Sequence, residues 1–264
     1  MSTLHVLGSG SGGNAFAVTA AGETLLVDAG FSAREIARRA EMVGLELASV
    51  TGLVLTHEHG DHTIGAARLA RQLDIPVYAS GGTLGALASR LNGRELRPLT
   101  PFAEHHHGPF TIEACPTTHD AAEPLAFVVS TSAGHRIGFA YDLGRPTTAV
   151  RYLLQGSHAL VLEANHDEVL LRTSDYPPVV QERIAGATGH LSNRAAADLL
   201  EPLLHAGLGT IVLAHLSERC NTAEHAMAEI RRVVGTHQAR VLVAIQEAPL
   251  PSIDLAMMGI PESV

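Results

Sequence analysis

The chain has 264 residues, 46% hydrophobic and 17% charged, and we expect one globular domain over residues 1–264 with a substantial core. The net charge of −9 argues against a protein that binds nucleic acid by its positive field alone, although bound divalent ions would add charge that this sum omits. The apolar runs are too short to cross a membrane, no secretory signal opens the chain, and two cysteines make no disulfide framework, so we expect a cytoplasmic protein without a membrane partner.

Strand-like apolar runs alternate with helical patterns along the chain, which predicts an α/β fold. We expect strands at residues 4–7, 15–18, 24–27, 53–55, 76–79, 111–115, 126–130, 135–140, 159–162, 210–214 and 241–244. We expect helices at residues 32–43, 63–73, 84–91, 147–154, 189–205 and 222–234. The less periodic stretch between Leu170 and Gly189 is interpreted as an insertion or lid, and His105-His106-His107 as a solvated turn flanked by proline and glycine.

The loop at residues 8–14 contains Gly-x-Gly-x-x-Gly, a pattern typical of dinucleotide-binding folds. That fingerprint needs a helix directly after the glycines, whereas two strands of a hairpin follow here, so we reject a dinucleotide site. The loop is rich in backbone donors, and Ser9, Ser11 and Asn14 are candidate contacts to a substrate phosphate. Simple turn geometry is the alternative.

The densest group of metal-binding side chains follows the buried strand at 53–55, in the segment Thr56-His57-Glu58-His59-Gly60-Asp61-His62. His57 and His59 are two residues apart, so their side chains point the same way from an extended backbone and can share one metal. The glycine allows a sharp turn that aims Asp61 and His62 at a second metal position, while Glu58 faces away. A solvated histidine-rich loop is the alternative, and nothing in such a loop requires this ordered mixture of nitrogen and oxygen ligands.

Three further candidate ligands follow other predicted strands: His119, Asp142 and His215. A single histidine at a strand end is more often a satisfied surface or core side chain than a ligand. Seven candidates that share one placement are hard to explain in that way. Mixed imidazole and carboxylate ligands suit zinc, manganese or iron, so we expect two divalent ions of one of these metals.

The motif His-x-His-x-Asp-His at the end of a strand resembles the signature of the metallo-β-lactamase superfamily, whose members are mostly dinuclear metallohydrolases. The resemblance implies a four-layer αββα sandwich. It also implies a first metal on His57, His59 and His119, a second on Asp61, His62 and His215, and a bridge at Asp142. Flavodiiron oxidoreductases of this fold carry an acid at the position of His59, which favours hydrolysis over redox chemistry here. Asp28 is expected to support the metal site.

Further segments resemble the YycJ (WalJ) branch of this superfamily: residues 118–124, 162–167, 176–177, 189–193 and 213–217. Members of that branch are metal-dependent exonucleases, so the resemblance implies a 5′ to 3′ exonuclease that acts on duplex DNA from a 5′ end. This chain departs from the branch after Ser217, where Glu218, Arg219 and Cys220 precede Asn221. Asn221 is retained as a candidate substrate contact.

The segment Gly-His-Leu-Ser-Asn at residues 189–193 opens a predicted helix. His190 is a candidate general acid for the leaving oxygen, and Ser192 and Asn193 are candidate phosphate contacts. The alternative is a capping and packing segment. Asp61 is a second catalytic candidate, because it can bind a metal and also accept a hydrogen bond from the nucleophile.

The histidine and aspartate that follow the strand at 159–162, His166 and Asp167, are candidates to orient a ligand imidazole. Packing is the alternative for this pair.

We therefore expect a phosphodiesterase in which a metal-activated hydroxide attacks phosphorus. A small-molecule phosphodiesterase is the nearest alternative, and the acidic net charge suits it better. Thioesterases and lactonases are a further alternative because the same nucleophile attacks carbonyl groups. A non-catalytic relative is disfavoured because the set of ligands is complete.

Overall fold

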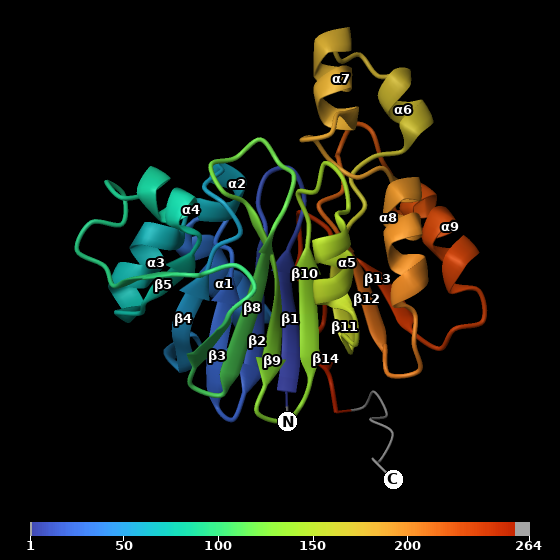
Figure 1. The fold of residues 1–264 in the computed structure, drawn as a ribbon. Coiled ribbons are helices and arrows are strands. Elements are labelled where there is room, and N and C mark those ends of the chain that lie inside the picture. Colours follow the sequence, from blue (N-terminus) through green and yellow to red (C-terminus); the bar gives the residue numbers. More distant parts are fainter. Residues whose placement is uncertain (1, 257–264) are drawn as a thin grey trace.

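The computed structural model describes residues 2–256, which form two seven-stranded β-sheets (Figure 1). In spatial order the first sheet contains β14 (Ile253–Asp254), β1 (Ser2–Gly8), β2 (Ala15–Ala20), β3 (Glu23–Val27), β4 (Val50–Val54), β5 (Val77–Ala79) and β6 (Leu96–Pro98). The second contains β13 (Arg240–Val243), β12 (Thr210–Ala214), β11 (Ala159–Glu163), β10 (Arg136–Ala140), β9 (Leu125–Thr131), β8 (Phe110–Pro116) and β7 (Glu104–His107).

Helices cover the outer face of each sheet and bury their apolar sides against it. On the first sheet these are α1 (Ala33–Met42), α3 (Ala66–Leu73) and α4 (Gly81–Ala86), with the single-turn α2 (Gly60–Thr63) at its upper edge. On the second they are α5 (Thr148–Leu154), α8 (Asn193–Leu200) and α9 (Ala223–Val234). Two more helices, α6 (Glu168–Arg172) and α7 (Pro178–Ala185), project above this edge, and short 3₁₀ turns occupy Leu47–Ser49 and Glu201–Leu203. The predicted four-layer αββα sandwich is confirmed.

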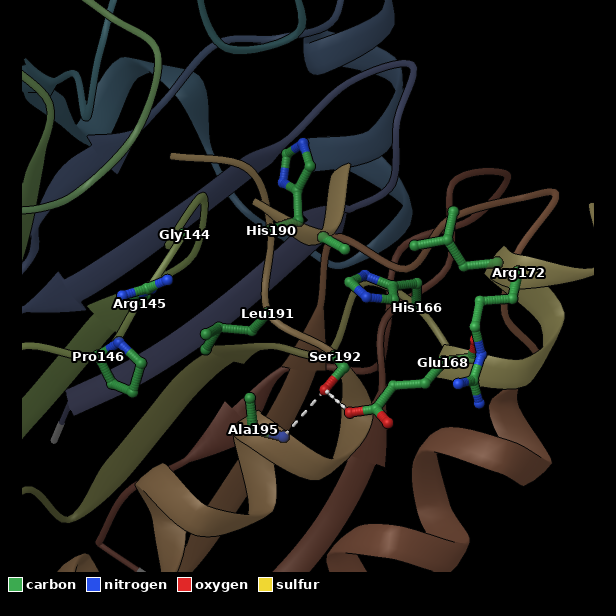
Figure 2. A pocket seen from close by; sticks show the side chains of 12 residues that line it. Gly144, Arg145, Pro146, His166, Glu168, Arg172, His190, Leu191, Ser192 and Ala195 are labelled. Atoms are coloured by element: carbon green, nitrogen blue, oxygen red, sulfur yellow. Dashed lines mark hydrogen bonds between the residues drawn. The ribbon is translucent and has the colours of Figure 1, made fainter. Parts of the chain in front are cut away.

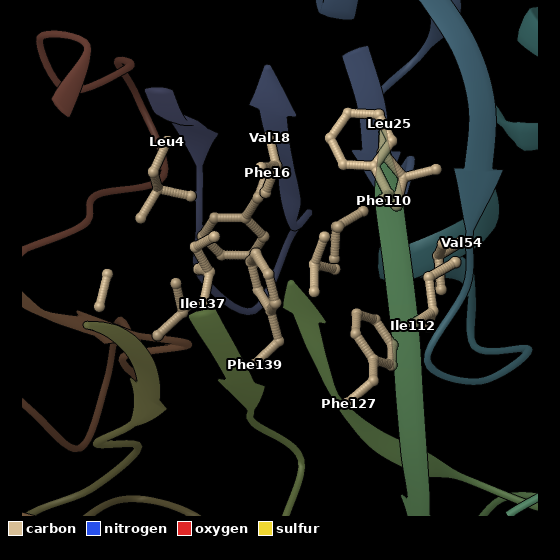
Figure 3. Close-up of a cluster of buried hydrophobic side chains, with 14 of the residues drawn as sticks. Leu4, Phe16, Val18, Leu25, Val54, Phe110, Ile112, Phe127, Ile137 and Phe139 are labelled. Atoms are coloured by element: carbon tan, nitrogen blue, oxygen red, sulfur yellow. The ribbon is translucent and has the colours of Figure 1, made fainter. Parts of the chain in front are cut away.

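The central core lies between the two sheets, where alternate side chains of each sheet interdigitate (Figure 3). The rings of Phe16 and Phe139 approach across the interface with centroids 5.9 Å apart, and Phe127 packs 5.6 Å from Phe139. Both sheets share this one core, which supports our proposal of a single domain. The predicted domain of residues 1–264 extends beyond the described residues at both ends.

The parallel strands of each sheet have their carboxyl ends at the same edge of the molecule. In the first sheet β3, β4 and β5 run parallel, and in the second β10, β11, β12 and β13 do so. The segments that follow the carboxyl ends of these strands therefore meet at that edge, which is where α/β proteins commonly place their sites.

Most predicted elements are confirmed, and the exceptions have physical causes. The helix expected at 63–73 begins at Ala66 as α3, and Thr63 ends the separate turn α2. Between the two helices Gly65 packs so closely that a Cβ there would lie 2.3 Å from the carbonyl oxygen of Phe31. The helix expected at 84–91 is instead α4, which Ser80 caps. The helix expected to reach residue 205 ends at residue 200 and continues as a 3₁₀ turn that contains Pro202.

The solvated turn predicted for the three consecutive histidines is wrong. Residues 105–107 belong to β7, which pairs antiparallel with β8 at the edge of the second sheet. His107 is held by hydrogen bonds to the hydroxyls of Tyr78 (2.9 Å) and Thr51 (3.0 Å) on the first sheet. The sequence also gave no signal for the short strands β6 and β14, which the structure adds at the two edges of the first sheet. Within the described residues no helix is both long and apolar enough to cross a membrane.

The pH dependence of folding stability has a testable contribution from His5 in β1. Burial lowers the pKa of His5 to about 4, whereas an unfolded chain has the ordinary value of 6.5. The unfolded state therefore takes up this proton first, so the contribution to stability is complete above pH 6.5 and is lost as the pH falls toward 4. We expect the free energy of unfolding to fall by about 2 kcal/mol more in wild type than in His5→Gln between about pH 7.5 and 5. Urea titrations at both pH values measure this, and equal losses in the two proteins would contradict it.

Candidate metal centre

The seven candidate ligands converge at the common edge of the two sheets. The loop after β4 supplies two of them and α2 two more, the loop after β8 supplies one, and the segments that follow β10 and β12 supply one each. Their ligand atoms fall into three overlapping groups, each within 4.8 Å: His57, His59 and His119; His57, His62 and Asp142; Asp61, His62 and His215. This grouping agrees with the two metal positions that the resemblance implies, with Asp142 between them.

Left-handed backbone turns the chain back over the sheet edge at three strand ends. Asp28, Asp142 and His215 have φ values of 57°, 56° and 56°, a region that residues with a Cβ rarely occupy. Each such residue costs of order 1–3 kcal/mol and persists only where the surrounding structure enforces it. Such residues cluster at functional sites, and these three lie at the ends of β3, β10 and β12.

The first metal position has three nitrogen ligands. His57 Nε2 is buried without a hydrogen-bond partner, and His59 Nδ1 and His119 Nε2 lie 3.3 Å apart. Burial, with the charge of His62, holds the pKa of His57 well below its ordinary value, and burial also lowers the pKa of His119. Neutral imidazoles with free lone pairs are the form that binds zinc and similar ions.

The second position combines imidazoles with ionised carboxylates. His62 Nε2 lies 3.3 Å from Asp61 Oδ2 and 2.9 Å from Asp142 Oδ2, and His215 Nε2 lies 3.4 Å from Asp61 Oδ2. Asp142 Oδ2 is buried, and His62 Nε2 is its close polar neighbour. Burial alone would raise the pKa of Asp142, but the charges of His215 and His62 hold it well below its ordinary range. A buried anionic oxygen beside imidazole nitrogens fits a divalent cation that all of them could bind, so this residue set can hold one.

A buried carboxylate outside the ligand set orients His62. Asp28 Oδ2 lies 2.7 Å from His62 Nδ1 and accepts a hydrogen bond from the Tyr141 hydroxyl at 2.9 Å, while Oδ1 accepts one from the Thr56 amide. Bonding at Nδ1 leaves Nε2 of His62 free to face the cluster. These contacts agree with the supporting role predicted for Asp28, which stays a prediction. Glu58 faces away as predicted, because its carboxylate accepts a hydrogen bond from the Ala122 amide.

Glu163, at the end of β11, is a site residue that the sequence analysis missed. It is fully buried, and Oε1 lies 2.7 Å from His190 Nδ1 and 3.4 Å from His215 Nδ1. Oε2 accepts hydrogen bonds from the amides of Leu143 and Leu191. Burial opposes its ionisation, but the charge of His190 lowers the pKa of Glu163 to about 2. Its position was the available signal: Glu163 is an acid at the end of β11, and β11 pairs with β10 and β12, which lead to the predicted ligands Asp142 and His215.

His190 lies at the rim of the cluster with its side chain 22% exposed. Burial alone would lower its pKa, but the charge of Glu163 and hydrogen bonds to Asp142 and Glu163 raise the pKa of His190 to about 10. Nδ1 lies 3.1 Å from Asp142 Oδ1. The imidazole is therefore a cation whose Nδ1 is occupied by carboxylates, with a cavity of about 310 Å³ beside it that also contains the cluster.

The glycine-rich loop supports the cluster instead of presenting its polar side chains to a substrate. Ser9 and Asn14 are buried; Ser9 Oγ donates to Asn14 Oδ1 at 2.6 Å and accepts from the His215 amide at 2.8 Å. Asn14 Nδ2 lies 3.3 Å from His62 Nε2. We correct the substrate-binding assignment of these two residues to positioning of the ligand loops. Ser11 is exposed and lines the cavity, so its assignment stays a proposal.

The other three candidate substrate contacts are also occupied by protein partners. Asn193 and Asn221 are buried and form a reciprocal pair of 2.9 Å hydrogen bonds, and Asn221 Nδ2 also donates to the carbonyl of Ala164. Ser192 caps α8 through the Ala195 amide (Figure 2). These contacts favour the capping and packing alternative for Ser192 and Asn193, and the substrate assignment of all three residues stays a prediction.

The stretch interpreted as an insertion or lid forms α6, α7 and their connection above the cluster (Figure 1). Tyr176, Arg183 and Ile184 from this segment line the cavity that contains the ligands. The guanidinium of Arg219, where the chain departs from the YycJ pattern, lies 5.2 Å from the centre of the Tyr176 ring. An aromatic ring and one cation, Arg183, therefore line the cavity, and Arg219 packs against that ring.

The orienting role considered for His166 and Asp167 is wrong. Asp167 caps α6 by accepting hydrogen bonds from the amides of Val169 and Leu170. His166 Nδ1 has no hydrogen-bond partner, and its ring faces a separate cavity. The imidazole of His215 is instead supported by Asn165, whose Nδ2 lies 3.4 Å from His215 Nδ1.

Comparison with known proteins agrees with this geometry. Residues 23–237 match the family model of the β-lactamase superfamily domain. The chain is 32% identical over 236 residues to exodeoxyribonuclease YycJ of Bacillus anthracis, covering 88% of this chain and 89% of that protein. It is 29% identical to exodeoxyribonuclease WalJ of Streptococcus pneumoniae, with 83% of each chain covered.

The fold also matches a solved structure of low sequence identity. The metallo-β-lactamase-fold protein YhfI of Bacillus subtilis superposes with a TM-score of 0.70 at 17% identity, covering 94% of this chain and 98% of that one. The family match covers most of the chain, and the relatives at about one third identity are aligned over nearly their whole length. The chain therefore belongs to the β-lactamase superfamily, as a metallo-β-lactamase-fold hydrolase of the YycJ/WalJ exonuclease family.

Proposed function

We propose that this protein is an exodeoxyribonuclease that uses two divalent ions of zinc, manganese or iron to digest duplex DNA from a 5′ end. The observation that carries the proposal is the cluster of seven imidazole and carboxylate ligands, five of which line one cavity of about 310 Å³ together with His190. The YycJ and WalJ relatives, which are named exodeoxyribonucleases, support DNA as the substrate. A cytoplasmic location stays a prediction.

The residues divide the chemistry of phosphodiester hydrolysis among them. When bound, the ions supply an activated nucleophile from water and stabilise negative charge on the phosphate. Asp61, ionised because hydrogen bonds from His215 and His62 lower its pKa, accepts a hydrogen bond from the attacking water. Glu163 and Asp142 hold the Nδ1 proton of His190, so its Nε2 donates the proton to the leaving oxygen.

A cation that lines the cavity and two arginines elsewhere on the same edge offset the acidic net charge where a DNA backbone would lie. Arg183 lines the cavity, Arg219 packs on Tyr176, and Arg145 lies on the loop after β10; all three arginines are exposed. Arginine suits phosphate recognition, and an aromatic ring offers a stacking surface for a base. These groups support nucleic acid over a compact small-molecule phosphodiester.

Metal binding depends on Asp142. We expect the wild-type protein, loaded with manganese or zinc and desalted, to retain about two ions per chain by elemental analysis. Asp142→Ala removes the carboxylate shared by both positions, so we expect it to retain less than half as much metal as wild type. The matched control is Asp175→Ala, since Asp175 is exposed and outside the cluster. Equal metal content in wild type and Asp142→Ala would contradict the bridging role.

Exonuclease activity is tested with a 5′-phosphorylated duplex labelled at its 3′ end. With added metal we expect wild type to shorten the labelled strand progressively and Asp142→Ala to leave it intact, because the nucleophile requires both ions. If wild type cleaves a chromogenic phosphodiester but no DNA, the small-molecule alternative replaces the nuclease proposal. Loss of the label as a mononucleotide at the first step would reverse the proposed polarity.

His190 is expected to act on the leaving group and not on metal binding. His190→Ala should lower kcat on DNA by roughly 10²–10⁴-fold, the usual contribution of a general acid, with metal content unchanged. His106→Ala is the matched control, because that imidazole is exposed on β7 far from the cluster. Full activity of His190→Ala in steady-state assays would remove the general-acid assignment.

A further inference from the structure

The three candidate ligands of the first metal position come from two different sheets. His57 and His59 follow β4 in the first sheet, whereas His119 lies in the segment between β8 and β9 in the second. Residues 117–124 form neither helix nor strand, so no regular hydrogen-bonded element sets the position of His119. A metal site needs its ligands on rigid supports. Contacts between this loop and the first sheet therefore decide whether the three imidazoles can share one ion.

Glu58, which lies between the two histidines of the first sheet, makes one such contact. Its Oε1 accepts a hydrogen bond from the Ala122 amide at 2.7 Å, and its Oε2 lies 3.5 Å from the Thr83 hydroxyl. The backbone of Glu58 is held as well, because its carbonyl oxygen accepts a hydrogen bond from the Thr63 hydroxyl at 3.2 Å. Glu58 thus joins the segment after β4 directly to the loop that carries His119.

Glu123 makes the opposite contact, from the loop of His119 to the helices of the first sheet. Its Oε2 accepts a hydrogen bond from the Gly82 amide at 2.7 Å in the first turn of α4, and its carbonyl oxygen accepts one from the Ser80 hydroxyl at 2.6 Å. The two segments are in close contact, since a Cβ on Gly82 would lie 2.7 Å from the Cβ of Glu123. The free amides of a helix N-terminus favour a carboxylate, so this contact is electrostatically favourable.

We propose that Glu58 and Glu123 are positioning residues that form a clasp between the two sheets and hold His119 at the distance from His57 and His59 that one metal ion requires. The inference rests on the two-metal centre of the proposed function. Two nitrogens bound at about 2.0–2.1 Å to one tetrahedral ion lie roughly 3.3 Å apart. His59 Nδ1 and His119 Nε2 have this spacing, at 3.3 Å. Loss of either carboxylate allows the loop to shift and weakens metal binding at the first position.

Zinc titration of the metal-free protein in competition with a chromogenic chelator tests the clasp through the two stepwise dissociation constants. Glu58→Ala removes the acceptor for the Ala122 amide, so we expect it to raise one of the two constants by about tenfold to hundredfold, the usual cost of losing a group that orients a ligand. The other constant should stay within about threefold of wild type. Glu123→Ala should have the same effect through the Gly82 amide, and it carries the prediction alone if Glu58→Ala does not fold.

Substitution with glutamine separates a positioning role from an effect of charge. Glu58→Gln and Glu123→Gln each keep a side-chain oxygen that can accept a hydrogen bond from the same amide. Both dissociation constants of each glutamine variant should therefore stay within about threefold of wild type. Glu41→Ala is the matched control for the alanine variants, because Glu41 is exposed on α1 and makes no part of the clasp. It should leave both constants unchanged.

Unchanged constants in the two alanine variants, or glutamine variants that bind zinc as weakly as the alanine variants, overturn the clasp. If wild type retains two ions and digests DNA in that case, the proposed function stands without it. If the alanine variants lose zinc affinity as expected but wild type digests no DNA, the clasp stands and the exonuclease proposal fails. If wild type binds fewer than two zinc ions, the two-metal function fails and this inference fails with it.

Discussion

The burial of carboxylates at one edge of two sheets is the constraint on which the site depends. Asp28 and Glu163 are fully buried and Asp142 is 2% exposed. An isolated buried carboxylate is strongly unfavourable, so each needs a cation or a donor. Asp28 and Glu163 have several imidazole, hydroxyl and amide partners, whereas Asp142 Oδ2 has only the contact with His62 Nε2 at 2.9 Å and His57 Nε2 has no hydrogen-bond partner. Divalent ions would complete this charge balance, so metal binding and the local structure depend on each other.

The inter-sheet core and the metal centre are physically continuous through Tyr141. Its ring packs 5.3 Å from Phe16 in the core and stacks 5.8 Å from the ring of His62, and its hydroxyl donates to Asp28. Ligand geometry is therefore set by rigid packing between two sheets, as metal sites require. The glycine-rich loop adds a second support, because Asn14 joins the loop backbone to His62. The rim, formed by α6 and α7, projects from this rigid base and carries the groups proposed to contact DNA.

The sequence predicted the fold and the ligand set because their signals are local. His57, His59, Asp61 and His62 lie within six residues after one apolar strand, and strand ends mark the others. The role of Glu163 was not predicted, because it depends on the pairing of β11 with β10 and β12, which no local pattern encodes. The three consecutive histidines were misjudged for the same reason: β7 exists through its partner β8. Tertiary contacts outweigh local preference at both places.

The most direct test of the account is a crystal structure of the manganese-loaded protein with anomalous diffraction recorded across the metal absorption edge. The account predicts two anomalous peaks, one among His57, His59 and His119 and the other among Asp61, His62 and His215, with Asp142 in contact with both. A single peak, or two peaks without Asp142 between them, would contradict the dinuclear centre on which the proposed chemistry rests.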